Sequence, residues 1–292
     1  MQGMFLEETI RSVLLQGYPD VEYFIIDGGS TDGSVEIIKK YAPWLAYWVS
    51  EKDRGQSDAI NKGLKRACGD IIAYINSDDW YAPGAFQTVA QRATTCPDET
   101  WWAGWVDNHP AGKPPERKLS SFTSMVEFLG RSEVLQQPGV FWKRELQEKV
   151  GLFNDRLHFL FDHEYWVRSL ATGYRPVNLD APIANFRIHG ESKSCLKQRL
   201  FMRETREVAR KFSNLIEPRQ QREVENRIRD YEAHYFVKII YGLLENGGRL
   251  AAIGYLIRSL SLLNRIRPVR IYFGAWARAL LTGKPPGWYR RI

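Results

Sequence analysis

Helix and strand patterns alternate through the first 95 residues, and this alternation constrains the fold more than any other feature of the sequence. The nearly continuous apolar run VEYFIID, at 21–27, indicates a strand that is buried on both faces. Similar strand patterns lie at 45–51 and 70–76, and helical patterns lie at 5–16, 33–41 and 56–67. A repeated strand–helix order predicts an α/β fold with a mainly parallel sheet and helices on both of its faces.

The pattern is less regular from residue 96 to about 190, and after residue 195 it is mainly helical. WWAGWV and QPGVFWKR have strand character, and FDHEYWVRSLATG has helical periodicity. The Pro-rich polar segment NHPAGKPPERK, at 108–118, predicts a surface loop. We therefore expect a domain at 1–195 and a helical extension at 196–292 that is basic and amphipathic after about residue 249.

Acidic turns directly follow two of the predicted strands. DGGSTDG occupies 27–33, and NSDDW occupies 76–80. Ligands of open parallel sheets bind beyond the carboxyl ends of the strands, so we expect both turns to border one crevice. Asp, Gly, Ser and Thr are also common in any tight turn between a strand and a helix, where they cap the helix. For DGGSTDG this simpler interpretation stays open.

The two adjacent carboxylates of NSDDW need a cation or hydrogen-bond donors nearby, because like charges repel each other. Mg²⁺ commonly binds through one or two carboxylates together with substrate phosphates. The turn therefore favours a site for a metal and a diphosphate. The alternative is a capped turn that opens a helix near Pro83.

A third pair of carboxylates, Asp162 and Glu164, lies in the predicted helix FDHEYWVRSL. Residues two positions apart do not share a helix face, so at most one of these side chains points inward from the helix. Asp162 lies near the start of the helix, where it serves either as an N-cap or as a general base.

The basic excess of the chain lies at its C-terminus. The formal net charge is +7, but residues 246–292 contain nine Lys or Arg and no acid, which leaves 32 basic and 34 acidic residues elsewhere. A body without basic excess argues against nucleic acid as a partner. Residues 249–281 combine apolar positions with Arg. This pattern favours either helices on an anionic membrane surface or helices that pack on the preceding domain.

The three cysteines, Cys68, Cys96 and Cys195, are widely spaced and form no CxxC pair. This arrangement indicates a reducing compartment and argues against a disulfide framework or a zinc site. No uninterrupted apolar stretch reaches the roughly 18 residues that a membrane-spanning helix needs. We expect a cytoplasmic protein, peripheral at the inner face of the cell membrane if the C-terminal helices bind lipid.

Five segments, in this order, resemble the family 2 glycosyltransferases. They are VEYFIIDGGSTDGS, EKDRGQSDAINKGLKRACGDIIAYINSDD, QPGVFWKR, FDHEYWVRSL and FRIHGESKS, and the resemblance covers about residues 2–195. It implies a GT-A (Rossmann-like) fold and inverting transfer, and within the family the chain is most similar to bacterial enzymes that build O-antigen and exopolysaccharide. The implied partners are a nucleotide-sugar donor, for which UDP is the family's commonest carrier, and a glycan or lipid-linked acceptor of the cell envelope.

The resemblance also implies roles for individual residues at the donor. The first acidic turn binds the nucleoside in this family, which maps onto Asp27 and less directly onto Asp32. Other positions near the donor map onto Asp53, Gly55, Asn61 and Asn76. Asn61 has an alternative interpretation as an ordinary helical residue.

The metal and the catalytic base are implied in the same way. The family's Asp-x-Asp motif, which carries Mg²⁺ or Mn²⁺ and the sugar diphosphate, maps onto Asn76, Ser77 and Asp78. His189 falls where relatives close the cleft over the diphosphate, and it is also counted as a metal ligand here; its alternative role is that of a packed histidine. Asp162 maps onto the carboxylate that takes the proton from the acceptor hydroxyl.

The sequence departs from the family pattern at two points. Asn76 replaces the first Asp of the motif, which removes one charge and lowers the expected affinity for the metal. Family members also begin with a strand before the first helix, whereas this chain opens at MQGMFLEETI. Neighbouring strands would then expose unpaired backbone groups. We expect either a true start further upstream, so that 1–195 is an N-terminally truncated catalytic domain, or a degenerate protein.

Two other functions remain as alternatives. A degenerate relative would bind a nucleotide sugar, or act as a membrane-associated scaffold, without catalysis. A nucleotidyltransferase also places carboxylates and a metal at strand ends, but it is expected to carry a Gly-rich basic phosphate loop, and none is visible in this sequence.

Overall fold

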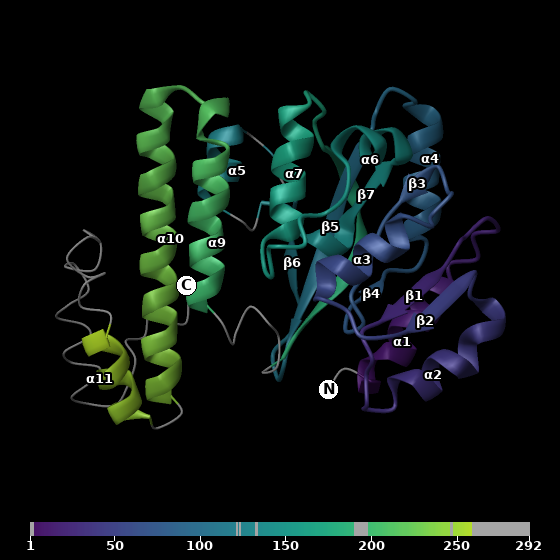
Figure 1. The fold of residues 1–292 in the computed structure, drawn as a ribbon, viewed down its shortest axis with the longest axis horizontal. Helices are drawn as coiled ribbons and strands as arrows, with labels where there is room; N and C mark the ends of the chain where they lie inside the picture. Colours follow the sequence, from purple (N-terminus) through teal and green to yellow (C-terminus); the bar gives the residue numbers. More distant parts are fainter. Residues whose placement is uncertain are drawn as a thin grey trace. The chain divides into compact units, whose positions relative to one another are not determined.

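The computed structural model describes residues 3–120, 122, 124–131, 134–189, 198–245 and 248–258. The chain forms two compact units, Met1–Ile216 and Glu217–Ile292, and the first contains every predicted site residue (Figure 1). Each unit is considered by itself below.

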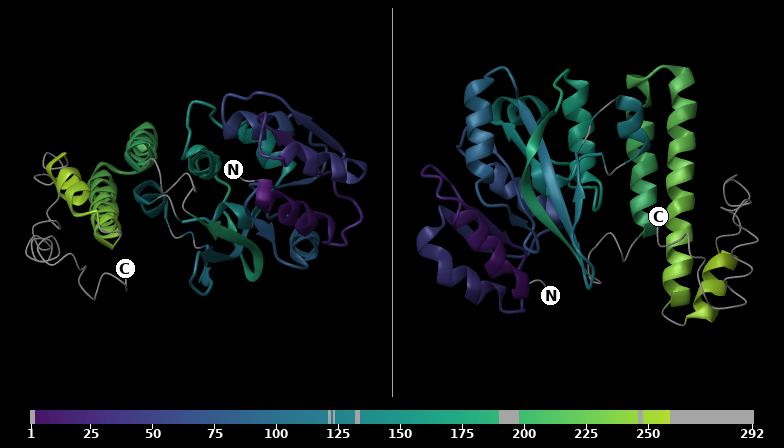
Figure 2. Two further views of the ribbon diagram at one scale, coloured as in Figure 1. Left: turned by 90° about the horizontal axis from the view of Figure 1, so that it is seen from below. Right: turned by 180° about the vertical axis from the view of Figure 1, so that it is seen from behind.

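One end of the first unit is a small layer built from the N-terminal elements (Figures 1 and 2). Strands β1 (Phe24–Asp27) and β2 (Tyr47–Ser50) pair in parallel. The helices α1 (Gly3–Leu14) and α2 (Ser34–Tyr41) bring apolar side chains together, and Leu6, Ile10 and Ile38 form their buried cluster. The spacing of Leu6 and Ile10 places both on one face of α1, as the helical pattern predicts.

A second, six-stranded sheet forms the centre of the first unit. Its strands are paired in the order β3-β7-β5-β8-β4, and β6 pairs with β5. The bounds are β3 Ile71–Ile72, β4 Trp80–Tyr81, β5 Trp101–Pro110, β6 Glu116–Lys118, β7 Val140–Lys143 and β8 Val177–Ile188. The β5–β8 pair is parallel and contains irregularities in register between Ala103 and Val106, whereas every other pair of this sheet is antiparallel.

The expectation of a mainly parallel sheet is therefore wrong: the sheet is mixed. The strand–helix alternation holds only up to about residue 95, and the later strands join the sheet without a regular order of crossover helices. The predicted strand 70–76 is also shorter than expected, because only Ile71 and Ile72 pair, and they pair with β7 and not with β1. The two acidic turns consequently follow strands of different sheets.

The predicted loop at 108–118 is wrong in part. β5 continues to Pro110 and β6 covers Glu116–Lys118, so the segment forms an antiparallel hairpin with a short turn at its tip. The Pro and Gly residues are confined to the turn and the strand end, where a ladder hydrogen bond is not needed.

The helices of the first unit besides α1 and α2 include those that border the site. They are α3 Gln56–Leu64, α4 Ala85–Thr95, α5 Met125–Gly130, α6 Arg144–Val150, α7 Phe161–Ala171 and α9 Gln198–Lys211, with short 3₁₀ turns η1 Ala42–Trp44, η2 Gln137–Gly139 and η3 Ser213–Leu215. Helix α9 lies in the segment that the sequence assigned to the extension, but it belongs to the compact unit that ends at Ile216.

An aromatic core lies between the central sheet and α7. Trp101 of β5 stacks on Trp166 of α7 with ring centroids 5.3 Å apart, and Trp142 of β7 meets Trp166 edge to face at 5.4 Å. Phe153 and Tyr165 complete this cluster, with centroids 4.4 Å apart. Large aromatic side chains bury much surface at a small cost in conformational freedom, so this core fixes α7 firmly against the sheet.

The part of the second unit that the structure describes, 217–245 and 248–258, is mainly helical. It contains α10 (Pro218–Glu245) and α11 (Arg249–Arg258), and Val224, Ile228 and Ala252 are among its buried side chains. Leu250 is 86% exposed. The predicted basic helices beyond residue 258 lie outside the described residues. None of the described helices is both long enough and apolar enough to cross a membrane.

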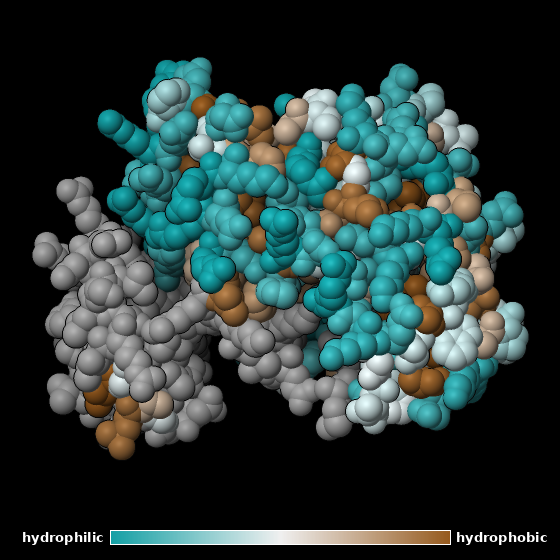
Figure 3. All heavy atoms as spheres, in the orientation of Figure 1, coloured by the Kyte–Doolittle hydropathy of each residue, from teal (hydrophilic) through white to brown (hydrophobic). Residues whose placement is uncertain are grey.

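The surface of the face shown in Figure 3 is mainly hydrophilic, and apolar side chains occur there in small separate groups. Among the described residues, Cys68 and Cys96 are free cysteines. Cys195 lies outside the described residues.

Gly104 of β5 lies where this strand packs closely against β8, so a substitution there tests the packing. A Cβ atom at this position would lie 2.1 Å from Ile183 Cγ1 and 3.0 Å from the Ala181 carbonyl oxygen. We expect Gly104→Ala to lower the free energy of unfolding of the first unit by about 1–3 kcal/mol, because the central parallel pair must separate. Urea denaturation followed by tryptophan fluorescence measures this change.

The matched control is Gly63→Ala in α3. There the added Cβ would be in ordinary contact with Ile26, at 3.7 Å from Cγ1. Replacing a helical glycine by alanine should leave the free energy of unfolding unchanged or raise it by up to about 1 kcal/mol. Equal destabilisation by the two substitutions would contradict the packing assigned to Gly104.

Candidate functional site

The carboxylate of Asp27 organises the turn that follows β1. It accepts hydrogen bonds from the backbone N–H of Gly29 and Ser30, at 3.1 and 2.9 Å, and from the hydroxyls of Ser30 and Ser50. Burial raises the pKa of Asp27, but the hydrogen bonds from Ser30 and Ser50 outweigh this effect and lower the pKa below its ordinary value. The strand therefore ends in a fixed negative charge.

Asp32 joins the starts of two helices. Its Oδ1 accepts hydrogen bonds from the Ser34 backbone N–H at 3.3 Å and the Ser34 hydroxyl at 2.6 Å, and its Oδ2 accepts one from the Gly3 N–H at 3.1 Å. The residue between, Gly33, has φ 88°, a left-handed conformation that favours glycine. Asp32 thus binds Ser34, the first residue of α2, whose N-cap is Gly33, and also holds the start of α1.

Asp53 brings the turn after β2 against the DGGSTDG turn, which follows β1. Its Oδ1 accepts a hydrogen bond from the Gly55 N–H at 2.9 Å, one residue before α3 begins. A Cβ atom at Gly28 would lie 2.5 Å from Asp53 Oδ2, so only glycine allows this close approach. The turns after β1 and β2 therefore meet at Gly28 and Asp53.

A chain of side-chain amides connects these turns to the NSDDW turn. Gln56 Nε2 donates to Asn76 Oδ1, and Asn76 Nδ2 donates to Gln137 Oε1 at 3.3 Å and to Asp79 Oδ2 at 3.2 Å. Gln137 Nε2 donates in turn to the Tyr74 carbonyl at 2.7 Å. Side chains at the start of α3 thus link the NSDDW turn to the turns after β1 and β2, and not one continuous sheet edge.

Asp78 and His189, two of the predicted metal ligands, are in contact. His189 Nε2 lies 3.1 Å from Asp78 Oδ2, and Asp78 is only 9% exposed. Arg187, two residues before His189, donates from Nε to the Asp78 carbonyl at 3.1 Å and thereby ties the end of β8 to the turn. A carboxylate suits Mg²⁺ or Mn²⁺ when substrate phosphates and waters complete the shell, whereas an imidazole is more typical of softer cations.

Few of the predicted metal ligands lie together. Among the residues that the structure describes, no group of three or more His, Cys, Asp or Glu side chains converges as a cation site. Asn76, the third predicted ligand, uses its Oδ1 to accept the Gln56 hydrogen bond and its Nδ2 to donate. The pair Asp78 and His189 is thus the part of the predicted metal set that the structure places in direct contact.

Asp79 relieves the crowding of charge in this turn by holding a proton. It is fully buried, and burial, followed by the negative charge of Asp78, raises its pKa to about 8. Its Oδ1 accepts a hydrogen bond from the Arg187 N–H at 3.0 Å, and its carbonyl accepts one from the Thr9 hydroxyl at 2.6 Å. Asp79 therefore connects α1, β8 and the turn.

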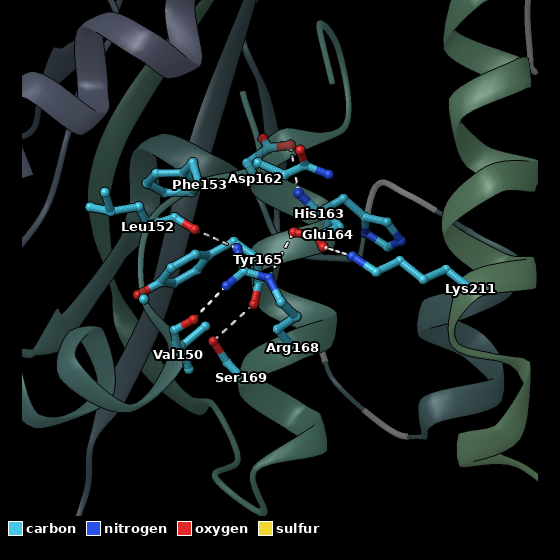
Figure 4. A network of polar contacts seen from close by, with 12 residues as sticks. Val150, Leu152, Phe153, Asp162, His163, Glu164, Tyr165, Arg168, Ser169 and Lys211 are labelled. Carbon is cyan, nitrogen blue, oxygen red and sulfur yellow. Dashed lines mark hydrogen bonds and ion pairs between the residues drawn. The ribbon is translucent and has the colours of Figure 1, made fainter. Parts of the chain in front are cut away.

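Asp162 is the second residue of α7 and is partly buried (Figure 4). Burial raises its pKa to about 6, although the His163 N–H, which donates to Oδ1 at 2.6 Å, favours the ionised form. Its negative charge contributes to the raised pKa of Tyr74, whose buried hydroxyl has no hydrogen-bond partner among the described residues. The N-cap of α7 is Leu160, so the N-cap interpretation of Asp162 is wrong.

Glu164 has a structural role. It is 1% exposed, and it accepts hydrogen bonds from Arg168 Nε at 2.8 Å and from Lys211 Nζ at 2.6 Å (Figure 4). Arg168 also donates to the Val150 and Leu152 carbonyls. Glu164 therefore ties α7 to α9, and of the two carboxylates in FDHEYWVRSL only Asp162 remains available for chemistry.

Asn61 is buried and bound to the backbone. Its Nδ2 donates to the Phe153 carbonyl and its Oδ1 accepts from the Phe153 N–H, both at 2.9 Å. This pair fastens α3 to the segment that leads into α7. A direct contact of Asn61 with the donor stays a prediction.

The comparisons with known proteins identify relatives by sequence. Residues 3–137 match the family described as Glycosyl transferase family 2. A Mycobacterium tuberculosis glycosyltransferase is 30% identical over 184 residues, which cover 62% of this chain and 69% of the relative. An Escherichia coli UDP-Gal:α-D-GlcNAc-diphosphoundecaprenol β-1,3-galactosyltransferase is 26% identical over 65% of this chain and 70% of its own length.

Two solved structures have a similar fold. Staphylococcus aureus TarS 1–349 aligns with a TM-score of 0.60 at 15% identity over 97% of this chain and 89% of that one, whereas a longer TarS chain is covered to only 42%. TarS 1–349 has also been solved with UDP and with UDP-GlcNAc. The mannosyltransferase PcManGT of Pyrobaculum calidifontis, in complex with GDP-Man and Mn²⁺, aligns with a TM-score of 0.50 at 19% identity over 96% of this chain and 82% of that one.

The raised pKa of Asp162 makes a prediction about stability. Because the folded-state pKa, about 6, exceeds the ordinary value of 3.8, ionisation of Asp162 lowers stability as the pH rises from about 4 to about 6. Asp162→Asn cannot ionise. We compare the free energy of unfolding of the variant with that of the wild type. The variant's value minus the wild-type value should be about 2–3 kcal/mol larger at pH 8 than at pH 4, which means that the variant becomes the relatively more stable protein as the pH rises.

Urea denaturation of both proteins across this pH range measures the difference. Asp20→Asn, at an exposed position, is the control for replacing an Asp by an Asn. A pH-independent difference for Asp162→Asn would show that the Asp162 carboxyl titrates normally.

Proposed function

Because the chain belongs to glycosyltransferase family 2 and so transfers a sugar from a nucleotide-sugar donor, we propose that the transfer inverts the anomeric configuration and is made to a cell-envelope acceptor. The observation that carries the proposal is Asp162, a carboxyl group with a pKa near 6 that forms no ion pair with any described residue, in the unit that also holds the acidic turns. Inversion by direct displacement requires a base of this kind for the acceptor hydroxyl.

The general base is Asp162. A carboxylate with a raised pKa is a better proton acceptor than an ordinary one and is still mostly ionised at neutral pH. The acceptor oxygen attacks the anomeric carbon as its proton passes to Asp162, and the nucleoside diphosphate leaves from the opposite face. Glu164, which is paired with Arg168 and Lys211, takes no part in this proton transfer.

The donor lies along the joined turns. Asp27, Asp53 and Asn76 bind its nucleoside and ribose, with Asp32 and Asn61 supporting the surrounding backbone. The contact between Gly28 and Asp53 brings two of these turns together before any ligand binds. UDP is the proposed carrier, which the UDP and UDP-GlcNAc complexes of TarS support by similarity of fold.

Asp78 and His189 hold a divalent cation, Mg²⁺ or Mn²⁺. When bound, the cation would stabilise the negative charge of the departing diphosphate. Asn76 is the remaining proposed ligand, through its carbonyl oxygen. The Mn²⁺ complex of PcManGT supports this assignment by similarity of fold.

The acceptor is a glycan or lipid-linked sugar of the cell envelope at the inner face of the membrane. The E. coli relative, whose name specifies a diphosphoundecaprenol-linked sugar as acceptor, supports this class. In the second unit α11 exposes Leu250 and Ile253, and the apolar, Arg-rich sequence continues beyond residue 258. We propose that this segment binds an anionic membrane surface, which would place a cytoplasmic protein close to lipid-linked acceptors.

The base assignment predicts a separation of catalysis from binding. Asp162→Asn should lower the turnover by about 10²- to 10⁴-fold and leave the affinity for UDP unchanged, because it removes a proton acceptor and no donor contact. Turnover is measured as UDP release from UDP-galactose and UDP-N-acetylglucosamine, with water and with diphosphoundecaprenol-linked N-acetylglucosamine as acceptors. In wild type the rate should fall below about pH 6 as Asp162 becomes protonated.

The exposed control Asp20→Asn should behave like wild type. An Asp162→Asn variant that retains full turnover would exclude the base. Loss of UDP binding in parallel with turnover would assign Asp162 to the donor site instead. A wild-type chain that binds UDP but turns over no donor would favour the non-catalytic alternative.

The metal assignment predicts that UDP binding depends on Asp78. Calorimetric titration of wild type with UDP should show tighter binding with Mn²⁺ than with a chelator, and GDP should bind more weakly. Asp78→Ala should abolish the difference between Mn²⁺ and chelator, since it removes the carboxylate that faces His189. If Mn²⁺ and Mg²⁺ leave UDP binding by wild type unchanged, Asp78 and His189 do not form a metal site.

A further inference from the structure

One buried carboxylate from a different helix holds the start of α7. Glu204 of α9 is 4% exposed, and its two oxygens accept three backbone hydrogen bonds. Oε1 accepts the His158 N–H at 2.9 Å, and Oε2 accepts the Phe159 and Leu160 N–H groups at 2.8 and 2.9 Å. These residues are the three that precede α7, so Glu204 fixes the segment from which Asp162 projects.

The segment needs such a partner because it does not cap itself. The N-cap of α7 is Leu160, which has no side-chain acceptor, and no side-chain capping bond is made there. Free N–H groups at a buried helix start must find acceptors, since an unsatisfied buried N–H lowers stability. Glu204, 44 residues away from Leu160, accepts the N–H of this N-cap residue and the N–H groups of the two residues before it.

We propose that Glu204 is a positioning residue for catalysis: by binding the N–H groups of residues 158–160 it fixes where the Asp162 carboxyl stands in the site. The proposal rests on the proposed role of Asp162 as the base. A shift of about 1 Å in a reacting group can reduce a rate about 100-fold, so a loose start of α7 would impair proton transfer even with Asp162 intact.

The charges around Asp162 also support an effect of Glu204 on this carboxyl group. Burial is the main cause of its raised pKa, and the negative charge of Glu204 adds to it. Two described groups close to Asp162 are uncharged. The Tyr74 hydroxyl stays protonated because its pKa is raised well above the ordinary value, and burial lowers the pKa of His163 to about 3. Glu164, two positions along the helix, points to Arg168 and Lys211 instead.

A second tie between α7 and α9 provides a comparison. Lys211 Nζ contacts Glu164 one turn further along α7, without touching the 158–160 backbone (Figure 4). Lys211→Ala loosens the two helices at this point and leaves the three hydrogen bonds of Glu204 in place. It separates a general loss of α7–α9 packing from loss of the specific bonds at the start of α7.

The test compares Glu204→Gln with two controls on the same helix, Lys211→Ala and the exposed Glu207→Gln. Glutamine keeps the shape of the side chain, but one oxygen becomes an NH₂ group that cannot accept a backbone N–H. Turnover is followed as UDP release from UDP-galactose and UDP-N-acetylglucosamine as a function of pH, UDP affinity by calorimetry, and stability by urea denaturation.

We expect Glu204→Gln to lower kcat by about 10- to 100-fold, with UDP affinity unchanged. The acid limb of the pH profile should move to lower pH, because a negative charge near Asp162 has been removed. Glu207→Gln and Lys211→Ala should retain kcat within about twofold and keep the limb in place. A stable Glu204→Gln variant with wild-type kcat overturns the proposal, as does a lower stability with an unchanged kcat and pH profile.

If Glu204→Gln does not fold, Glu204→Asp takes its place. The shorter carboxylate keeps the charge but cannot reach all three N–H groups, so kcat should fall while the acid limb stays in place. A wild-type kcat for this variant overturns the proposal.

A readout without turnover separates this proposal from the proposed function. The pH-dependent difference in stability between wild type and Asp162→Asn is measured again in the presence of Glu204→Gln. If the charge of Glu204 raises the pKa of Asp162, its removal brings that pKa closer to the ordinary value. The difference in stability should then develop over a narrower pH range, even in a chain that shows no transfer. An unchanged range refutes the coupling, whereas loss of turnover in wild type alone refutes only the role of Asp162 as base.

Discussion

The main constraint on this structure is the concentration of carboxylates at the ends of short strands. Like charges at close range in a partly buried site are unfavourable unless each one is satisfied. The chain satisfies them in different ways. Asp27 accepts hydrogen bonds from its own turn, Asp78 faces His189, and Asp79 takes up a proton at neutral pH. The turns at which we propose that the donor binds are therefore organised largely by the protein's own hydrogen bonds. A bound cation or diphosphate would meet charges that are already fixed in place.

The same constraint explains how the acidic turns are linked although the sequence pattern does not predict the arrangement of the strands. β1 and β3 belong to different sheets, so backbone pairing does not align the turns that follow them. Helix α3 makes the connection instead. Its first residue, Gln56, donates to Asn76, and the turn before it places Asp53 against Gly28. Polar side chains replace the ladder hydrogen bonds as the means of bringing the acidic turns together.

The sequence was informative where function depends on local residue type. The helices α1, α2 and α3, the strands β1 and β2 and the acidic turns could be predicted, because a buried strand, a helix and a turn have short signatures. The mixed sheet could not, since pairing of β5 with β7 and β8 joins segments far apart in the chain. Glu204 was missed for the same reason: FMRETREVARK is an ordinary helical sequence, and its function depends entirely on what it meets in space.

These contacts place the proposed base on a segment that is held from two directions. Asn61 of α3 binds the backbone of Phe153 at one end of that segment, and Glu204 of α9 binds residues 158–160 at the other. Because α3 also carries Gln56, one helix links the amide at the NSDDW turn with the approach to Asp162. Helix α3 is therefore tied both to the NSDDW turn and to the start of the segment before Asp162, because Gln56 and Asn61 lie on the same helix. The buried carboxylate of Glu204 holds the other end of that segment, so Asp162 projects from a backbone that polar side chains fix at both ends.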